Sequence, residues 1–120
     1  MLVSLKAQDP QNDTANIPPL RHDDRYVVLE IYAKFQGATY FRIDPMDGSA
    51  PALFDSHHFR VTSTAVPSAW VAECTELGSL YLRPAEWGRD GFWESFFDDE
   101  EWARIQYSNL RDRIIAESQA

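Results

Sequence analysis

The chain has 120 residues, of which 44% are hydrophobic and 13% aromatic, a composition that excludes a disordered protein. With 19 acidic and 11 basic side chains, its formal net charge is -8. This charge argues against nucleic acid and anionic membranes as partners, because phosphates repel it, and favours a basic protein partner or no charged partner at all. The length predicts a single domain over residues 1–120, with a β-barrel part at 1–66 and a part at 67–120 that contains a hairpin and C-terminal helices.

The first half of the chain predicts short strands separated by turn residues. Residues 1–6 are expected to form a short strand, and the polar, proline-containing segment 8–24 a long loop. The run RYVVLEIYAKF at 25–35 is rich in β-branched and aromatic residues and predicts one strand. Three further strands are expected at 38–44, 52–55 and 59–64. A Pro-Met-Asp-Gly turn follows the first of them, and a His-His corner follows the second.

In the second half of the chain, the spacing of the apolar residues changes from that of strands to that of helices. Residues 70–75 and 79–83 flank a Leu-Gly pair and predict a hairpin, and Pro84 opens a short helical turn. Helical spacing then appears twice, in one stripe of Phe92, Trp93, Phe96 and Phe97 and in another of Ala103, Tyr107, Leu110 and Ile114. Ser95 and the pair Asp98-Asp99 are candidate caps for the second helix. The sequence thus predicts strands followed by helices.

Acidic residues concentrate where the helices are expected. From Glu86 to Trp102 there are seven acidic side chains and one arginine, a net charge of -6 out of the chain's -8. Such concentrated charge acts on association rate and partner choice more than on folding. The candidate partner-binding residues are therefore the acids of this segment and its tryptophans: Trp87, Trp93, Glu94, Asp98, Asp99, Glu100, Glu101 and Trp102.

The aromatic residues admit two interpretations. Rings at helical spacing usually pack onto the body of a domain, and Trp70, Tyr81 and Trp87 are placed to fill the space between the strands and the helices. Tryptophan and tyrosine are also the residues that dominate protein interfaces. Both roles are compatible in one segment, with rings that anchor a helix and carboxylates that face a partner.

No motif for catalysis, a cofactor or a metal accompanies these features. His57 and His58 lie near Asp55, but adjacent histidines in a strand point to opposite faces, so a polar corner is the better interpretation. Asp44–Gly48 lacks the spacing and closing glutamate of a calcium loop. We expect a protein that is not an enzyme, without catalytic residues, cofactor or metal.

The single cysteine and the N-terminal residues bear on the compartment. Cys74 has no partner for an internal disulfide, which favours a reducing environment, and its place in an alternating strand predicts a buried core thiol. The segment MLVSLKAQD lacks the apolar run of a signal peptide, and no stretch approaches the about 20 apolar residues of a membrane span. The expected location is the cytoplasm.

The run RYVVLEIYAKFQGATYFRIDPMDGSAPALFDSHHFRVTS, residues 25–63, resembles an SH3-like small barrel. With its acidic-aromatic C-terminal extension, the chain is similar to bacterial proteins encoded beside polymorphic toxins, some of which serve as immunity proteins. The resemblance covers about half of the chain and carries no catalytic signature. It implies an α+β fold, mainly antiparallel β, with an SH3-like barrel followed by a β-hairpin and C-terminal helices.

The resemblance also implies a function. The expected protein is an immunity protein that occludes the active site of a cognate toxin domain with its acidic-aromatic surface. A non-catalytic adaptor or structural barrel in a larger assembly is the alternative, with acids that serve solubility. A small enzyme built on the barrel is a third possibility, which a deep pocket with a perturbed carboxylate or histidine would favour.

Overall fold

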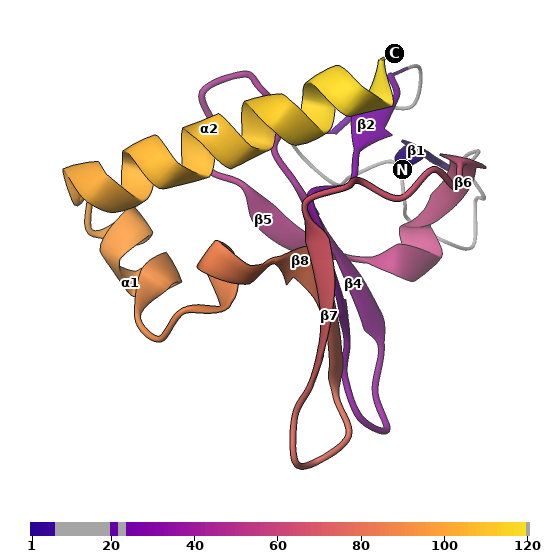
Figure 1. Cartoon of the computed structure of the whole chain (residues 1–120). Coiled ribbons are helices and arrows are strands. Elements are labelled where there is room, and N and C mark those ends of the chain that lie inside the picture. The colour runs from indigo at the N-terminus through magenta and orange to yellow at the C-terminus, as the bar shows by residue number, and fades with distance from the viewer. Residues whose placement is uncertain (7–19, 22–23, 120) are drawn as a thin grey trace.

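The computed structural model describes residues 1–6, 20–21 and 24–119, so most of the loop predicted at 8–24 lies outside the described residues. The fold is α+β, with mostly antiparallel sheets followed by two C-terminal helices (Figure 1). Its elements in chain order are β1 Leu2–Leu5, β2 Tyr26–Val27, β3 Glu30–Ala33, β4 Thr39–Ile43, β5 Ala52–Asp55, a 3₁₀ turn Ser56–His58, β6 Phe59–Ser63, β7 Trp70–Cys74, β8 Leu80–Pro84, a 3₁₀ turn Ala85–Gly88, α1 Phe92–Phe97 and α2 Glu101–Ser118.

The strands form two sheets. A three-stranded sheet has the order β2-β1-β6, and a five-stranded sheet has the order β5-β4-β3-β8-β7. The hairpin β7–β8 belongs to the second sheet, because β8 pairs with β3 and places Leu82 opposite Ile31. Two long hairpins, β3–β4 and β7–β8, therefore project side by side away from α2 (Figure 1).

The prediction of one strand at 25–35 was wrong, because the chain changes sheets within it. Tyr26 pairs with Val3 in the small sheet, whereas Glu30 pairs with Arg42 in the large one. Between them, Val28 and Leu29 are 0% and 1% exposed. The apolar run that suggests a continuous strand is thus a buried crossing between two sheets.

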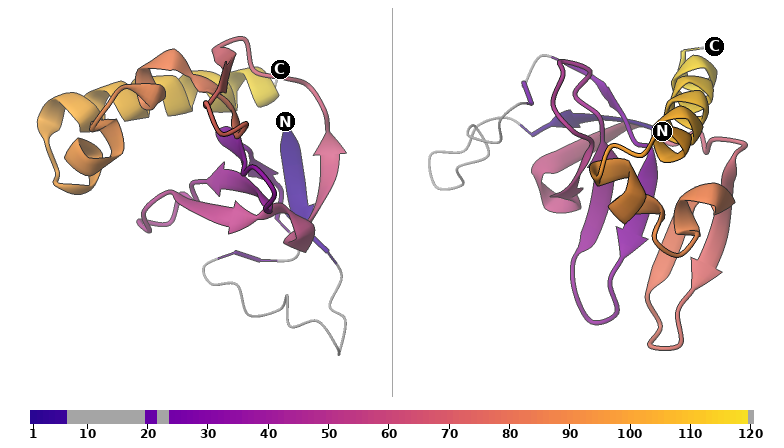
Figure 2. Two further views of the ribbon diagram at one scale, coloured as in Figure 1. Left: turned by 90° about the horizontal axis from the view of Figure 1, so that it is seen from below. Right: turned by 90° about the vertical axis from the view of Figure 1, so that its left-hand side faces the viewer.

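Helix α2 lies across the end of the large sheet opposite the hairpin turns (Figures 1 and 2). The stripe predicted from its spacing is the packed one, because Ala103, Tyr107 and Ile114 are buried and Leu110 packs against the core. Trp70 joins this core and donates a hydrogen bond from Nε1 to the carbonyl oxygen of Leu29 at 2.8 Å. No helix within the described part of the chain is long and apolar enough to cross a membrane.

Two local predictions are corrected. Glu100 is the N-cap residue of α2 and makes no side-chain capping bond, so Ser95, Asp98 and Asp99 do not cap this helix. Cys74 is exposed instead of buried, because β7 is the edge strand of the large sheet and Cys74 lies at its far end, where no other element covers it.

Candidate functional site

The two C-terminal helices meet at a sharp acidic turn. Asp98 is the C-cap of α1, and Asp99 has a left-handed backbone with φ of 60°, which only a minority of residues other than glycine adopt. Glu100 is then the N-cap of α2, which begins at Glu101. The turn reverses the chain between the helices and exposes the side chains of Asp98, Asp99, Glu100 and Glu101.

Toward the inside of this turn, aromatic rings form a continuous cluster. Phe92 and Phe96 of α1 are each 1% exposed and lie against Trp87 and Tyr107, respectively. The Trp87 and Tyr107 ring centroids are 5.3 Å apart, and both rings are buried. Trp87 is 1% exposed, so this ring has no surface for a partner and we remove it from the candidate interface.

Trp93 has a partner within the protein. The guanidinium of Arg42 lies 3.9 Å from the centroid of its ring, and Trp93 is only partly buried. Arg42 is in turn held by Glu30, whose Oε2 accepts from Nε of Arg42 at 2.8 Å. Much of the Trp93 ring is therefore covered by other residues of the protein, so only a small part of its surface is accessible to a partner.

Glu30 is the centre of a buried ion network that no sequence motif indicates. Besides Arg42, its carboxylate pairs with Arg83 at 3.4 Å, and its side chain is only 2% exposed. Arg83 also pairs with Glu73 at 3.3 Å. A Cβ added at Gly88 would lie 2.8 Å from both Arg83 Nη2 and Glu73 Oε1, so a larger residue at this position would force these paired side chains to move.

Toward the outside of the turn, three large apolar side chains remain exposed. Phe97, Trp102 and Ile105 are 50%, 43% and 53% exposed. Trp102 lies edge-on to Phe92, with 6.0 Å between ring centroids, and its Nε1 donates to Glu100 Oε2 at 2.9 Å. We call the set that surrounds them the acidic corner; it consists of Glu94, Phe97, Asp98, Asp99, Glu100, Glu101, Trp102 and Ile105.

The carboxylates of the acidic corner differ in whether they form ion pairs or hydrogen bonds with other residues of the protein. Asp99 forms an ion pair with Arg104, although Asp99 remains 81% exposed. Hydrogen bonds from Ser95 and Trp102 lower the pKa of Glu100, so it is ionised at neutral pH. Asp98 and Glu101 form no ion pair with any other described residue. The charge at the corner is thus only partly compensated.

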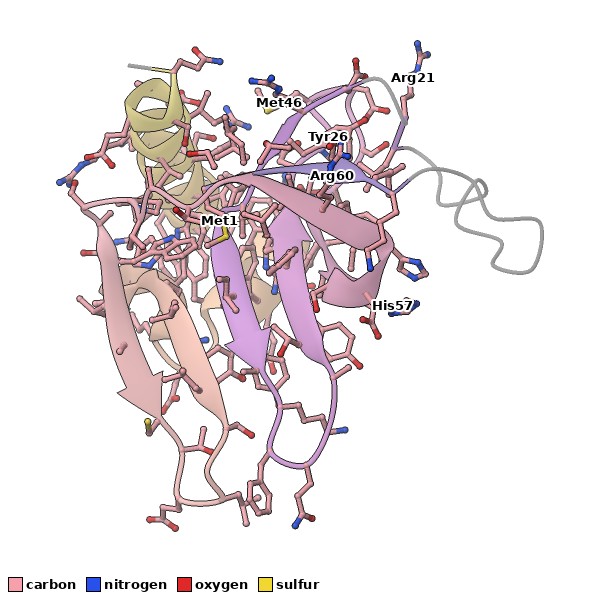
Figure 3. All side chains as sticks on the ribbon, turned by 90° about the vertical axis from the view of Figure 1, so that its right-hand side faces the viewer. Met1, Arg21, Tyr26, Met46, His57 and Arg60 are labelled. Carbon is pink, nitrogen blue, oxygen red and sulfur yellow. The ribbon has the colours of Figure 1, made fainter. Side chains whose placement is uncertain are left out.

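A cavity opens beside the acidic corner, between the β4–β5 loop and α2. Its volume is about 370 Å³. One side is lined by Asp44, Met46, Gly48, Ser49, Ala50 and Pro51, and the other by Phe96, Arg104, Tyr107, Ser108 and Arg111. The loop that carries Met46 lies near α2 in Figure 3. Sequence reasoning missed this cavity because its two walls are about sixty residues apart in the chain.

Asp44 lies at the base of this cavity with its side chain 7% exposed. Its Oδ2 accepts from the hydroxyl of Tyr107 at 2.7 Å and from Arg111 Nη1 at 3.4 Å, and its Oδ1 accepts from the backbone amide of Met46 at 2.9 Å. Burial and the adjacent Asp44 carboxylate raise the pKa of Tyr107 well above its usual value. Tyr107 is therefore a neutral donor at any physiological pH.

The histidine corner differs from its prediction in geometry. His57 and His58 lie in the 3₁₀ turn after β5 and not in a strand, so their rings are close together, with centroids 3.9 Å apart, instead of on opposite faces. Burial lowers the pKa of His58. His57 lies at the surface away from α2 (Figure 3). Within the described residues, which do not include His22, no group of three histidine, cysteine or acidic side chains is placed to hold a metal ion.

A comparison of the chain with family models, with curated proteins and with solved structures found no match.

Proposed function

We propose that this protein is an immunity protein, which binds a cognate toxin domain through the acidic corner and occludes its active site. The observation that carries the proposal is the presence of three exposed apolar side chains, Phe97, Trp102 and Ile105, in or directly after the acidic segment 86–102. Protein interfaces combine such apolar anchors with a charged rim that selects the partner.

The electrostatic part of the proposal rests on Asp98 and Glu101. These two exposed carboxylates have no ion-pair partner among the residues described, so a cationic partner gains their full attraction without breaking an internal bridge. Asp99 is available at a lower gain, because a partner must compete with Arg104. Charge of this kind accelerates encounter, which suits an inhibitor that must capture a toxin before it acts.

The apolar part rests mainly on Trp102. Its ring is 43% exposed, its inner edge is held by Phe92, and its Nε1 is bound by Glu100. The ring is therefore held in place before binding, which reduces the entropy that association costs. Phe97 and Ile105 are the other exposed apolar side chains of the acidic corner, and both are additions to the residues expected from sequence.

For the fold, we propose that the strands are those of an SH3-like barrel, as their resemblance to that family implies. The supports are the small sheet β2-β1-β6 and the buried crossing at Val28 and Leu29, where the chain passes into the large sheet. A change of sheet within one apolar run is typical of small barrels whose strands bend at corners. The helices then form the extension that carries the acidic corner.

The test measures association of this protein with the toxin domain encoded by the neighbouring reading frame, at low and at high salt. We expect the wild-type on-rate to fall steeply with salt. The double variant Asp98→Asn with Glu101→Gln is expected to associate about tenfold more slowly at low salt. Its salt dependence should also be weaker, because two charges have been removed from the contact.

The matched control is the double variant Glu76→Gln with Asp112→Asn. It removes the same charge from the exposed tip of the β7–β8 hairpin and from the middle of α2. Its on-rate should stay within about twofold of wild type, because these charges lie outside the contact. Equal slowing by both variants, or an on-rate indifferent to salt, would refute the acidic corner as the docking surface.

The same experiment separates the alternative function, an adaptor or structural domain whose acids serve solubility. In that case the corner variant binds its assembly partner as tightly as wild type, and no inhibition of a toxin accompanies binding. Trp102→Ala distinguishes the two further, because loss of an interface anchor costs about 2 kcal/mol of binding free energy or more. An adaptor that binds elsewhere is unaffected by this change.

A further inference from the structure

We propose that the cavity between the β4–β5 loop and α2 is a binding site for a carboxylate borne on a small, flat apolar group. This site is separate from the docking role of the acidic corner, and binding to it is a property of the free chain. Its volume of about 370 Å³ lies within the range of about 300 to 1,000 Å³ that is usual for small-ligand sites.

The cavity is rich in hydrogen-bond donors that come from one face of α2. Arg104, Ser108 and Arg111 are spaced by four and three residues, so the helix presents them in a row along one side of the cavity. Tyr107 lies in the same row and is turned to Asp44. In a chain with a net charge of -8, two arginines that line one cavity are a distinct local environment.

The one acidic side chain that lines the cavity is already satisfied. Asp44 accepts hydrogen bonds from Tyr107, from Arg111 and from the backbone of Met46. A cationic ligand would have to displace one of these donors from a carboxylate that is 7% exposed. The cavity therefore offers little to a cation beyond what the fold already uses.

The guanidinium groups, in contrast, keep spare donors. Arg104 donates one hydrogen bond to Asp99, and Arg111 donates one to Asp112 and one to Asp44, whereas a guanidinium has five N–H groups. The carboxylates of Asp99 and Asp112 hold the two arginines without using all of their donors. Arginine donors in this state suit a carboxylate, which accepts two parallel hydrogen bonds.

Apart from Gly48 and Ser49, the rest of the cavity wall is apolar and sets the shape of the ligand. Met46, Ala50 and Pro51 form the loop side, and Phe96 forms the helix side. The guanidinium of Arg104 lies 4.1 Å from the centroid of the Phe96 ring, so a charged and an apolar contact are adjacent. A monoanionic carboxylate on a flat apolar group satisfies both, and a dianionic phosphate meets more repulsion from the nearby Asp44, Asp99 and Asp112.

The test uses three probes of almost equal shape and different charge: benzoate, benzamide and benzamidine. Each is titrated into the free wild-type chain at constant ionic strength and followed by amide and arginine side-chain NMR signals. We expect benzoate to shift the signals of Ser108, Gly48 and the Arg104 and Arg111 side chains with a saturating curve. Benzamide should bind at least about tenfold more weakly, the loss expected for a charge-assisted hydrogen bond. Benzamidine should not bind.

Matched variants then locate the binding. Arg104→Gln, at a side chain that is 44% exposed, should weaken benzoate binding about tenfold. Arg113→Gln removes the same charge from an exposed position of α2 that does not line the cavity, and should leave binding unchanged. A dispersed NMR spectrum of each variant verifies that it is folded.

Three results would overturn the proposal. The first is the absence of saturable shifts with benzoate, and the second is tighter binding of benzamidine than of benzoate. The third is equal weakening by Arg104→Gln and Arg113→Gln, which would mean that only the general charge of α2 attracts the anion. Because all of these measurements use the free chain, they are independent of whether the acidic corner binds a toxin.

Discussion

Two groups of aromatic side chains, one inside and one outside the turn between α1 and α2, have similar composition and opposite environments. Trp87, Phe92 and Phe96 are each 1% exposed, whereas Phe97 and Trp102 are 50% and 43% exposed. Successive side chains of a helix point in different directions around its axis, so in α1 Phe96 faces the body of the protein while the next residue, Phe97, faces solvent. The comparison shows that aromatic residues at helical spacing are not all part of the core, even when they are adjacent in sequence.

The largest expected effect tests this contrast directly. Trp87→Ala removes a buried ring that contacts Phe92, Trp93 and Tyr107, and should lower the free energy of unfolding by about 3 to 5 kcal/mol. Trp102→Ala removes a ring at the surface and should cost less than about 1 kcal/mol. Urea denaturation of both variants measures the difference. Similar losses in the two variants would mean that the outer ring is also structural.

The next prediction concerns the charged side chains behind the inner group. Glu30→Gln leaves the buried Arg42 without its carboxylate partner and removes one of the two carboxylates that pair with Arg83, and should cost about 3 kcal/mol. It should also broaden the NMR signals of Trp93, because Arg42 is no longer fixed over its ring. The comparison variant is Asp99→Asn, which breaks the exposed pair with Arg104 and should change stability by less than about 1 kcal/mol. Equal effects would contradict the distinction between the inner and outer sides.

The smallest effect is expected at Tyr107, where the inner cluster meets the cavity. Tyr107→Phe keeps the ring and removes the hydrogen bond to Asp44, at a cost of about 1 to 1.5 kcal/mol.

The same variant has a predicted pH dependence. The folded-state pKa of Tyr107 is raised by burial and by Asp44, so its contribution to stability is complete below the unfolded-state pKa of about 10 and is lost as pH rises above it. Stability of the wild type should therefore decline above about pH 10 more steeply than that of Tyr107→Phe. Parallel declines in denaturation curves recorded at several alkaline pH values would contradict this assignment.

The fold class and most elements follow from sequence because their signals are local. The hairpin at Leu77 and Gly78 and the packed stripe of α2, with Ala103, Tyr107 and Ile114, were predicted from spacing alone and are confirmed. The crossing at Val28 and Leu29 was missed, since buried residues in a bend have the same composition as residues in a buried strand. Local composition reports burial, and it does not report which sheet a residue joins.

The candidate site was predictable only in part, for a related reason. Charge is visible in a sequence, so Asp98, Asp99, Glu100 and Glu101 were identified and are exposed. The burial of Trp87 depends on α2 packing over it, which spacing within its own segment does not reveal. The cavity around Asp44 depends on contacts across the whole chain. Its one available signal was the row formed by Arg104, Ser108 and Arg111 on the same side of α2 as Tyr107.

The pairing of β3 with β8 has a consequence for synthesis. β3 finds one neighbour at once in β4, but its other neighbour is made about fifty residues later. A growing polypeptide therefore exposes the open edge of β3 until β8 has left the ribosome. Its aromatic rings stay uncovered for longer, because Tyr107, which packs against Trp87 and Phe96, is synthesised later. Unpaired strand edges and uncovered rings are what chaperones bind and what aggregates form from. Release of α2 is thus the step at which the nascent chain covers its aromatic cluster and completes its acidic corner.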